Sequence, residues 1–263
     1  DVLINNAGGA GPKQALEKIP FTEADRIASG DGETMLDAVR GLLGGPWNMV
    51  RATAPHMKPG ASIVNVSTIF SRTDYYGRIP YVVPKSGLNA LSLGLARELG
   101  AQGRGIRVNT VFPGPIESER IDNVFAAMDG LQDLPSGSTS EKFKGLMILE
   151  RSGEDGTRRR YPTPLDVGST VLWLATPESA ALSGHAFEVT NGMQVPAQSR
   201  AKLVSWPDKR LVDLVGKVVL ILGGRDLDET LAFADRHALH GASLVLGFRD
   251  IDVVERARMA LQQ

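Results

Sequence analysis

A tyrosine and a lysine four positions apart, Tyr81 and Lys85, stand within the polar stretch STIFSRTDYYGRIPYVVPKSGLNALS, residues 67–92. On a helix this spacing places both side chains on one face. A phenol has a pKa of about 10 and exchanges protons poorly near neutral pH, but an adjacent ammonium can stabilise the phenolate and lower that pKa. Neither Tyr75 nor Tyr76 has a lysine four positions on. The spacing therefore predicts Tyr81 as an acid–base residue, and a packing or pocket-lining role for the other two tyrosines.

Strand-like and helix-like segments alternate over the first 193 residues and would position this pair. The strand-like segments are 1–9, 61–68, 105–114 and 185–192. The helix-like segments are 22–43, 47–57, 80–99 and 164–176. The apolar spacing of 80–99 is that of a long helix, and Pro84 is tolerable in its first turn. The alternation predicts βαβ units and an α/β fold with a parallel sheet.

Three further segments differ from this pattern. Residues 119–163 are long, mixed and polar, and we expect an insertion with helices at 119–131 and 142–150 that closes over the substrate site. Residues 194–213 are interpreted as a linker. Residues 214–263 begin a second strand–helix–strand unit with GKVVLILGG.

Composition excludes several classes of function. The chain has 263 residues and a formal net charge of -1, so no general electrostatic attraction to nucleic acid or anionic lipid is expected. The longest apolar runs are too short to cross a bilayer. There are no cysteines, which excludes disulfides and thiolate metal sites, and the four histidines form no HExxH pattern. We predict a cytoplasmic protein without a metal, a membrane partner or a nucleic-acid partner.

Three motifs together resemble the short-chain dehydrogenase/reductase family: NNAG at 5–8, YVVPK at 81–85 and IRVNTVFPGPIES at 106–118. The resemblance covers residues 1–193 and implies a Rossmann-like doubly wound parallel sheet that reduces a carbonyl with a nicotinamide cofactor. It implies that Tyr81 donates the proton, assisted by Lys85. It also implies a hydroxyl that holds the substrate oxygen. The family's spacing favours Thr68, whereas residue type favours Ser67, and the two face opposite sides of a strand.

The same resemblance implies a set of cofactor-binding residues. The NNAG turn would bring backbone close to the cofactor, PGPIES would pack on the nicotinamide carboxamide, and Ser118 would offer a hydroxyl. The set is Asn5, Asn6, Ala7, Gly8, Tyr81, Lys85, Pro113, Gly114, Ile116 and Ser118.

The sequence departs from the family's pattern at three places. Gly41 and Leu42 stand where the family has an Asn, so a proton relay through that Asn is in doubt, and water or Asn6 could replace it. The phosphate loop is expected upstream of residue 1, so 1–193 is interpreted as a catalytic domain lacking its first strands. In the second unit the loop GGRDLDET offers carboxylates where a pyrophosphate would sit, which predicts a degenerate, non-binding copy.

A reductase domain followed by a degenerate copy resembles one subgroup of the family, the N-terminal portions of bifunctional malonyl-CoA reductases. That resemblance implies NADPH-dependent reduction of malonate semialdehyde to 3-hydroxypropionate. Arg72 and Arg78 lie between the hydroxyl pair and Tyr81, and an arginine fork suits a substrate carboxylate. Arg120 and the RRR run at 158–160 are weaker candidates.

Two alternatives remain open. One is a 3-oxoacyl or other carbonyl reductase of the same family, and the other is a non-catalytic scaffold domain of a multidomain reductase. For either reductase the expected partner is a small-molecule substrate. We also expect a homodimer of a larger multidomain polypeptide.

Overall fold

The computed structural model of the chain describes residues 1–9, 11–25, 33–73, 77–101, 103–151, 160–193, 218–222 and 243–247. The chain divides into two compact units, Asp1–Gln198 and Ser199–Gln263, and each is considered by itself. The predicted linker at 194–213 lies outside the described residues.

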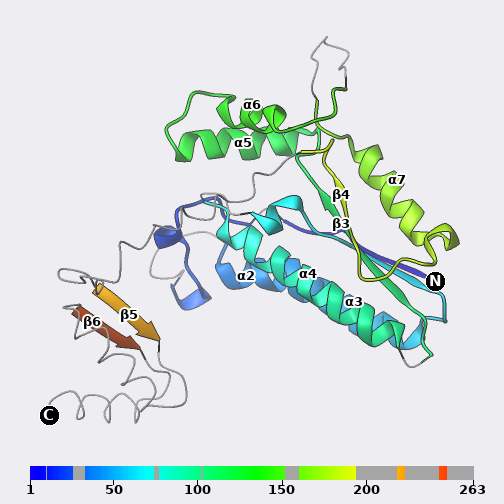
Figure 1. The fold of residues 1–263 in the computed structure, drawn as a ribbon. Coiled ribbons are helices and arrows are strands. Elements are labelled where there is room, and N and C mark those ends of the chain that lie inside the picture. Colours follow the sequence, from blue (N-terminus) through cyan, green and yellow to red (C-terminus); the bar gives the residue numbers. More distant parts are fainter. Residues whose placement is uncertain are drawn as a thin grey trace, which may run out of the picture. The chain divides into compact units, whose positions relative to one another are not determined.

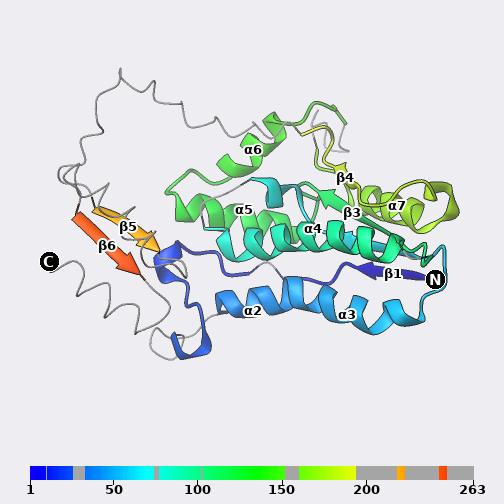
Figure 2. The ribbon, with the colours of Figure 1, turned by 60° about the horizontal axis from the view of Figure 1, so that its bottom comes forward.

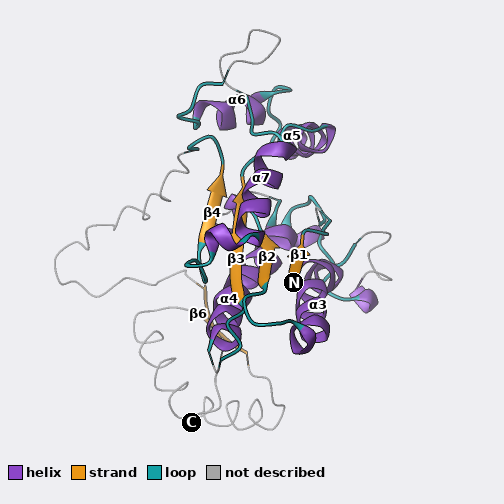
Figure 3. Ribbon diagram, turned by 90° about the vertical axis from the view of Figure 1, so that its right-hand side faces the viewer, coloured by secondary structure: helices purple, strands orange, loops and turns teal. Residues whose placement is uncertain are grey.

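A four-stranded parallel sheet forms the centre of the first unit. Its strands are β1 (Val2–Asn5), β2 (Ser62–Val66), β3 (Arg107–Pro113) and β4 (Ala186–Val189), side by side in this order (Figure 3). Every residue of β2 and all but the last of β3 are buried, as expected for parallel strands covered on both faces. The predicted α/β fold with a parallel sheet is confirmed.

Helices cover both faces of this sheet. In Figure 1 the strands run between α7 (Pro164–Ala175) on one side and α3 (Gly45–Thr53) and α4 (Ile79–Gly100) on the other. Side chains alternate along the strands accordingly. Ile63 and Val108 pack with α3 and α4, whereas Val64 and Val111 pack with α7.

The helical path before β2 differs from the prediction of two helices at 22–43 and 47–57. Residues 23–25 are helical. Further along, α2 (Met35–Val39) continues through a π-helical turn η2 (Arg40–Gly44) and runs directly into α3 (Figure 2). Thr34 fixes the start, because its hydroxyl accepts a hydrogen bond from the Asp37 amide and the Asp37 side chain accepts one from the Thr34 amide. Residues 26–32 lie outside the described part.

Two helices, α5 (Glu119–Leu131) and α6 (Ser138–Gly145), lie alongside one another in the predicted insertion (Figures 1 and 2). The first matches its prediction. The second begins and ends earlier than the predicted 142–150, because Asp129 accepts hydrogen bonds from the amides of Gly137 (2.8 Å) and Thr139 (2.9 Å) and so fixes the first turn of α6. Phe125 and Phe143 stack across the pair, with ring centroids 5.1 Å apart.

Short 3₁₀ segments complete the first unit: η1 (Leu16–Lys18), η3 (Ala54–His56), η4 (Ile69–Arg72) and η5 (Pro177–Ser179). In the second unit β5 (Val218–Leu222) and β6 (Ser243–Gly247) pair in parallel. The acidic loop on which the prediction of a degenerate copy depends lies outside the described residues. Within the described part of the chain, no helix has the length and apolar character needed to cross a membrane.

Candidate active site

A cavity of about 630 Å³ opens at the carboxyl ends of β1, β2 and β3. Parallel strands all end at this edge, so residues distant in sequence meet there. Tyr81 and Lys85 line the cavity together with both members of the hydroxyl pair, Ser67 and Thr68. The structure thus brings together the four residues predicted to be catalytic.

Hydrogen bonds join the start of α4 to the end of β2 beneath this cavity. Lys85 is 5% exposed, and its ammonium donates a hydrogen bond to the Val66 carbonyl (2.7 Å). The Ser67 hydroxyl donates to the Lys85 carbonyl (3.3 Å). Ser67 therefore joins strand to helix. The Thr68 hydroxyl donates a hydrogen bond to the Pro113 carbonyl (3.4 Å) and also acts on Tyr81, whose pKa it lowers. Both hydroxyls line the cavity, and which of them holds the substrate oxygen stays a prediction.

The electrostatics of Tyr81 differ from the expectation. Burial raises the pKa of its phenol, and the hydrogen bond from Thr68 and the charges of Arg78 and Arg120 offset part of that rise. Lys85 was expected to lower this pKa, but its ammonium is directed to the Val66 carbonyl instead. Burial, and to a smaller extent Arg120, lowers the pKa of Lys85 to about 8. Burial thus favours the protonated form of the Tyr81 phenol.

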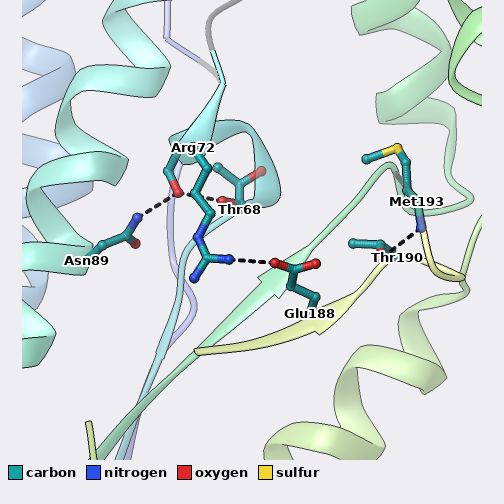
Figure 4. A network of polar contacts seen from close by, with 7 residues as sticks. Thr68, Arg72, Asn89, Glu188, Thr190 and Met193 are labelled. Carbon is teal, nitrogen blue, oxygen red and sulfur yellow. Dashed lines mark hydrogen bonds and ion pairs between the residues drawn. The ribbon is translucent and has the colours of Figure 1, made fainter. Parts of the chain in front are cut away.

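The two arginines predicted to bind substrate have different positions. Arg72 extends toward β4 (Figure 4), forms an ion pair with Glu188 (2.6 Å), and lies outside the cavity. Its guanidinium also stacks 4.4 Å from the centroid of the Phe112 ring. The charge of Arg72 thus already has a partner, 116 positions away in the sequence, and its role in substrate binding stays a prediction.

Arg78, in contrast, lines the cavity and is 7% exposed. Its guanidinium lies 4.8 Å from the centroid of the Tyr81 ring. Its Nη1 is buried and has no hydrogen-bond partner. Among the described residues that line the cavity there is no Asp or Glu. A buried charged donor without a partner is costly, so the site is suited to an anionic ligand.

Eight of the predicted cofactor-binding residues line the cavity: Asn6, Gly8, Tyr81, Lys85, Pro113, Gly114, Ile116 and Ser118. Asn5 does not, because its amide donates to the Asn65 side chain (2.8 Å), which in turn donates to Ser92 (2.9 Å) and so connects β1, β2 and α4. Ala7 is also absent from the lining.

Gly8 provides a test of whether a nucleotide fits. A Cβ at Gly8 would lie 2.9 Å from the Leu42 side chain and 3.8 Å from the Lys85 ammonium. Only glycine leaves this space open, so backbone and ammonium can approach a ligand together. Lys85, Asn6 and Ser118 offer hydrogen-bond donors around the turn at Gly8. Such donors can bind the hydroxyls and the amide oxygen of a nicotinamide riboside. The residues present fit the group.

Leu42, with Gly41, stands at the position where the resemblance to the family predicts an Asn. It lies in the π-helical turn, is 2% exposed, and packs beneath Gly8. Asn6 lines the cavity nearby. Its role in proton transfer, as a replacement for the family's Asn, stays a prediction.

The sequence analysis missed the second wall of the cavity. Apolar side chains from α5 and α6 form it: Ile121, Val124, Phe125, Met128 and Phe143. The spacing of the first four, i, i+3, i+4 and i+7, was the signal that could have revealed it. Arg120, ranked low from the sequence, also lines the cavity and donates a hydrogen bond to the Gly8 carbonyl (3.4 Å).

A family model described as enoyl-(acyl carrier protein) reductase matches residues 1–194. The chain therefore belongs to this family of short-chain dehydrogenases/reductases, which are NAD(P)H-dependent oxidoreductases. The fold, the tyrosine–lysine pair and the hydroxyl at the end of β2 agree with that membership.

Several known proteins are similar to this chain, at different levels of sequence identity and coverage. The crystal structure of the N-domain, with NADP, of a bacterial malonyl-CoA reductase is 45% identical, with a TM-score of 0.85, and the match covers 100% of this chain and 49% of that one. The 7α-hydroxysteroid dehydrogenase of Clostridium sardiniense is 29% identical, over 73% of this chain and 63% of the relative. A 3-oxoacyl-[acyl-carrier-protein] reductase of Staphylococcus aureus is 27% identical, over 73% and 65%. The chain spans less than two thirds of the length of both curated relatives.

Proposed function

We propose that the chain is the part of a bifunctional malonyl-CoA reductase that reduces malonate semialdehyde to 3-hydroxypropionate with NADPH. The similarity to the NADP-bound N-domain of a bacterial malonyl-CoA reductase supports this proposal. The observation that carries it is the unpartnered, buried Nη1 of Arg78, in a cavity without a carboxylate among its described lining residues. Malonate semialdehyde would supply the missing anion.

Each polar residue of the site then has a role. A nicotinamide cofactor, when bound, would supply a hydride to the carbonyl carbon. Tyr81, whose phenol form burial favours, would donate its proton to the carbonyl oxygen, and the Thr68 hydroxyl would donate a hydrogen bond to the same atom. Lys85 and Asn6 would hold the nicotinamide riboside, and Ser118 and the 113–116 segment would hold the carboxamide. Arg78 binds the substrate carboxylate and so orients the aldehyde.

The test is NADPH oxidation by the full natural polypeptide with malonate semialdehyde and with propanal, which has the same chain length but no carboxylate. We expect a clear preference for malonate semialdehyde in kcat/KM. Arg78→Gln should lower kcat/KM for malonate semialdehyde about 30-fold or more, since a hydrogen bond to a charged group contributes about 2 kcal/mol. Arg72→Gln is the matched control and should change it little. Equal use of both aldehydes by the wild type would refute the proposed substrate.

A second candidate, reduction of a 3-oxoacyl thioester, is favoured by one observation. The wall formed by α5 and α6 is apolar and could contact an acyl chain. Acetoacetyl-CoA in the same assay separates the two candidates, because it places no carboxylate near Arg78. A non-catalytic scaffold is disfavoured by the convergence of Tyr81, Lys85 and Thr68 on one cavity. A homodimer and a cytoplasmic location stay predictions.

A further inference from the structure

The position of Arg78 relative to Tyr81 suggests a second role beyond holding a carboxylate. Arg78 is the residue that precedes α4, three positions before Tyr81, and its guanidinium lies 4.8 Å from the centroid of the Tyr81 ring. A cation within about 6 Å of an aromatic ring interacts directly with that ring, most strongly when both are shielded from water. The same guanidinium has one buried nitrogen free for a ligand. The charge of Arg78 therefore faces both the Tyr81 ring and the cavity in which substrate would bind.

The other charged groups around Tyr81 are also cations. Arg120 faces it from α5, Lys85 lies one turn further along α4, and Lys13 comes close to both Arg78 and Arg120 from the segment before α2. The Thr68 hydroxyl at the end of β2 is the neutral partner of the phenol. Among the described residues that line the cavity, none is acidic. An arriving carboxylate would thus add a negative charge to a cavity whose described charged groups are all cations.

We propose, building on the proposed function, that Arg78 couples substrate binding to the protonation of Tyr81. A carboxylate bound at the free Nη1 neutralises the cation beside the ring, which keeps Tyr81 in its phenol form. Reduction requires that form, because the phenol oxygen must give its proton to the carbonyl oxygen as the carbonyl carbon gains the hydride that a nicotinamide cofactor would supply. Tyr81 then regains its proton from solvent while the product carboxylate is still bound. The arrangement favours reduction of carboxylated aldehydes over oxidation of the corresponding alcohols.

A direct titration of Tyr81 tests this coupling without relying on activity. The tyrosinate absorbance of the full natural polypeptide is measured against pH, and the Tyr81→Phe variant is subtracted to isolate this one phenol. The titration is repeated with saturating 3-hydroxypropionate and with 3-hydroxypropionamide, its neutral counterpart. We expect the carboxylate to raise the apparent pKa of Tyr81 by about one unit. The amide should leave it unchanged.

The variants separate coupling from simple binding. Arg78→Gln should raise the pKa of Tyr81 in the absence of ligand and abolish the response to 3-hydroxypropionate. Arg78→Lys should keep part of that response, which provides a readout if the glutamine variant does not fold. Arg72→Gln, the matched loss of an arginine outside the cavity, should titrate as the wild type does. An unchanged Tyr81 pKa in Arg78→Gln, or no response of the wild type to the carboxylate, would overturn the coupling.

The outcomes also distinguish this inference from the proposed function. If the wild type prefers malonate semialdehyde over propanal but its Tyr81 pKa does not respond to 3-hydroxypropionate, Arg78 only binds substrate and the coupling is refuted. If the pKa responds but malonate semialdehyde is no better than propanal, the coupling stands and the proposed substrate is wrong.

Discussion

The two walls of the cavity are built in different ways. The wall at the strand ends is polar, and its side chains are held by specific hydrogen bonds, such as those from Lys85 to Val66 and from Ser67 to Lys85. The wall from α5 and α6 is apolar and is held by packing, with Phe143 stacked on Phe125 and in edge contact with Phe70. Directional bonds fix atoms where charge and protons move, whereas packing fixes a shape.

This difference predicts that the walls respond differently to substitution. Changes in the polar wall should act on catalysis with little effect on folding, as long as no buried group is left unpaired. Changes in the apolar wall should act first on stability. Substitutions matched in size on the two walls can therefore confirm or break the comparison.

The largest effect is expected at Tyr81, in the polar wall. Tyr81→Phe keeps the ring and removes the proton, so kcat for aldehyde reduction should fall by about 10²- to 10⁴-fold. NADPH oxidation measures it, and nucleotide binding followed by fluorescence should remain. Survival of aldehyde reduction in this variant would place the chemistry elsewhere and favour the scaffold alternative.

The next effect is expected at Phe143, in the apolar wall. This ring is 1% exposed and contacts two other aromatic rings. Phe143→Ala should lower the free energy of unfolding by about 3–5 kcal/mol, through lost transfer energy and the cavity left behind. Urea unfolding measures it, with Leu134→Ala, at an exposed leucine beyond α5, as the control. A loss no larger than that of the control would show that α5 and α6 unfold independently of the sheet.

The sequence predicted the polar wall better than the apolar one, for a physical reason. Tyr81 and Lys85 are one helical turn apart, so their relation is local and follows from spacing alone. The hydroxyl pair at the end of β2 follows from strand alternation. These signals depend on the backbone path of one or two neighbouring elements.

Where the structure adds to or departs from the sequence-based expectations, the deciding partner is distant in the sequence. Arg72 and Arg78 are equivalent by spacing, but Glu188 on β4 pairs with Arg72 and no described residue pairs with the Nη1 of Arg78. The start of α6 depends on Asp129 in the preceding helix. The continuous path through α2, η2 and α3 depends on a π-helical turn that apolar periodicity does not reveal.

A smaller effect is expected when the two hydroxyls are compared. Thr68→Val removes a hydrogen bond to the reacting oxygen and keeps the side-chain shape, so kcat/KM should fall about 10- to 100-fold. Ser67→Ala should change kcat/KM by only a few-fold, because its hydroxyl bonds to the Lys85 carbonyl at a long 3.3 Å. Aldehyde reduction with unfolding curves for both variants measures the contrast. The reverse order would show that Ser67 holds the substrate oxygen and that the observed register of the hydroxyls changes on binding.

The smallest effect is expected at the start of α7, whose Pro164 and Val167 complete the apolar wall. Asp166 accepts hydrogen bonds from the amide (2.7 Å) and hydroxyl (2.8 Å) of Thr163 and pairs with Arg151 (2.9 Å). The Thr163 amide is the main cause that lowers the pKa of Asp166 to about 2 from its usual 3.8. Because the folded-state pKa is the lower one, the carboxylate stabilises the fold above pH 4, and this contribution is lost as the pH falls toward 2.

The carboxylate is partly exposed, so Asp166→Asn should lower the free energy of unfolding by no more than about 1 kcal/mol at neutral pH. Urea unfolding at several pH values should show the difference from wild type vanish near pH 2, with aldehyde reduction at neutral pH unchanged. A loss of activity there would mean that the start of α7 shapes the polar wall too, and the separation between the two walls would not hold.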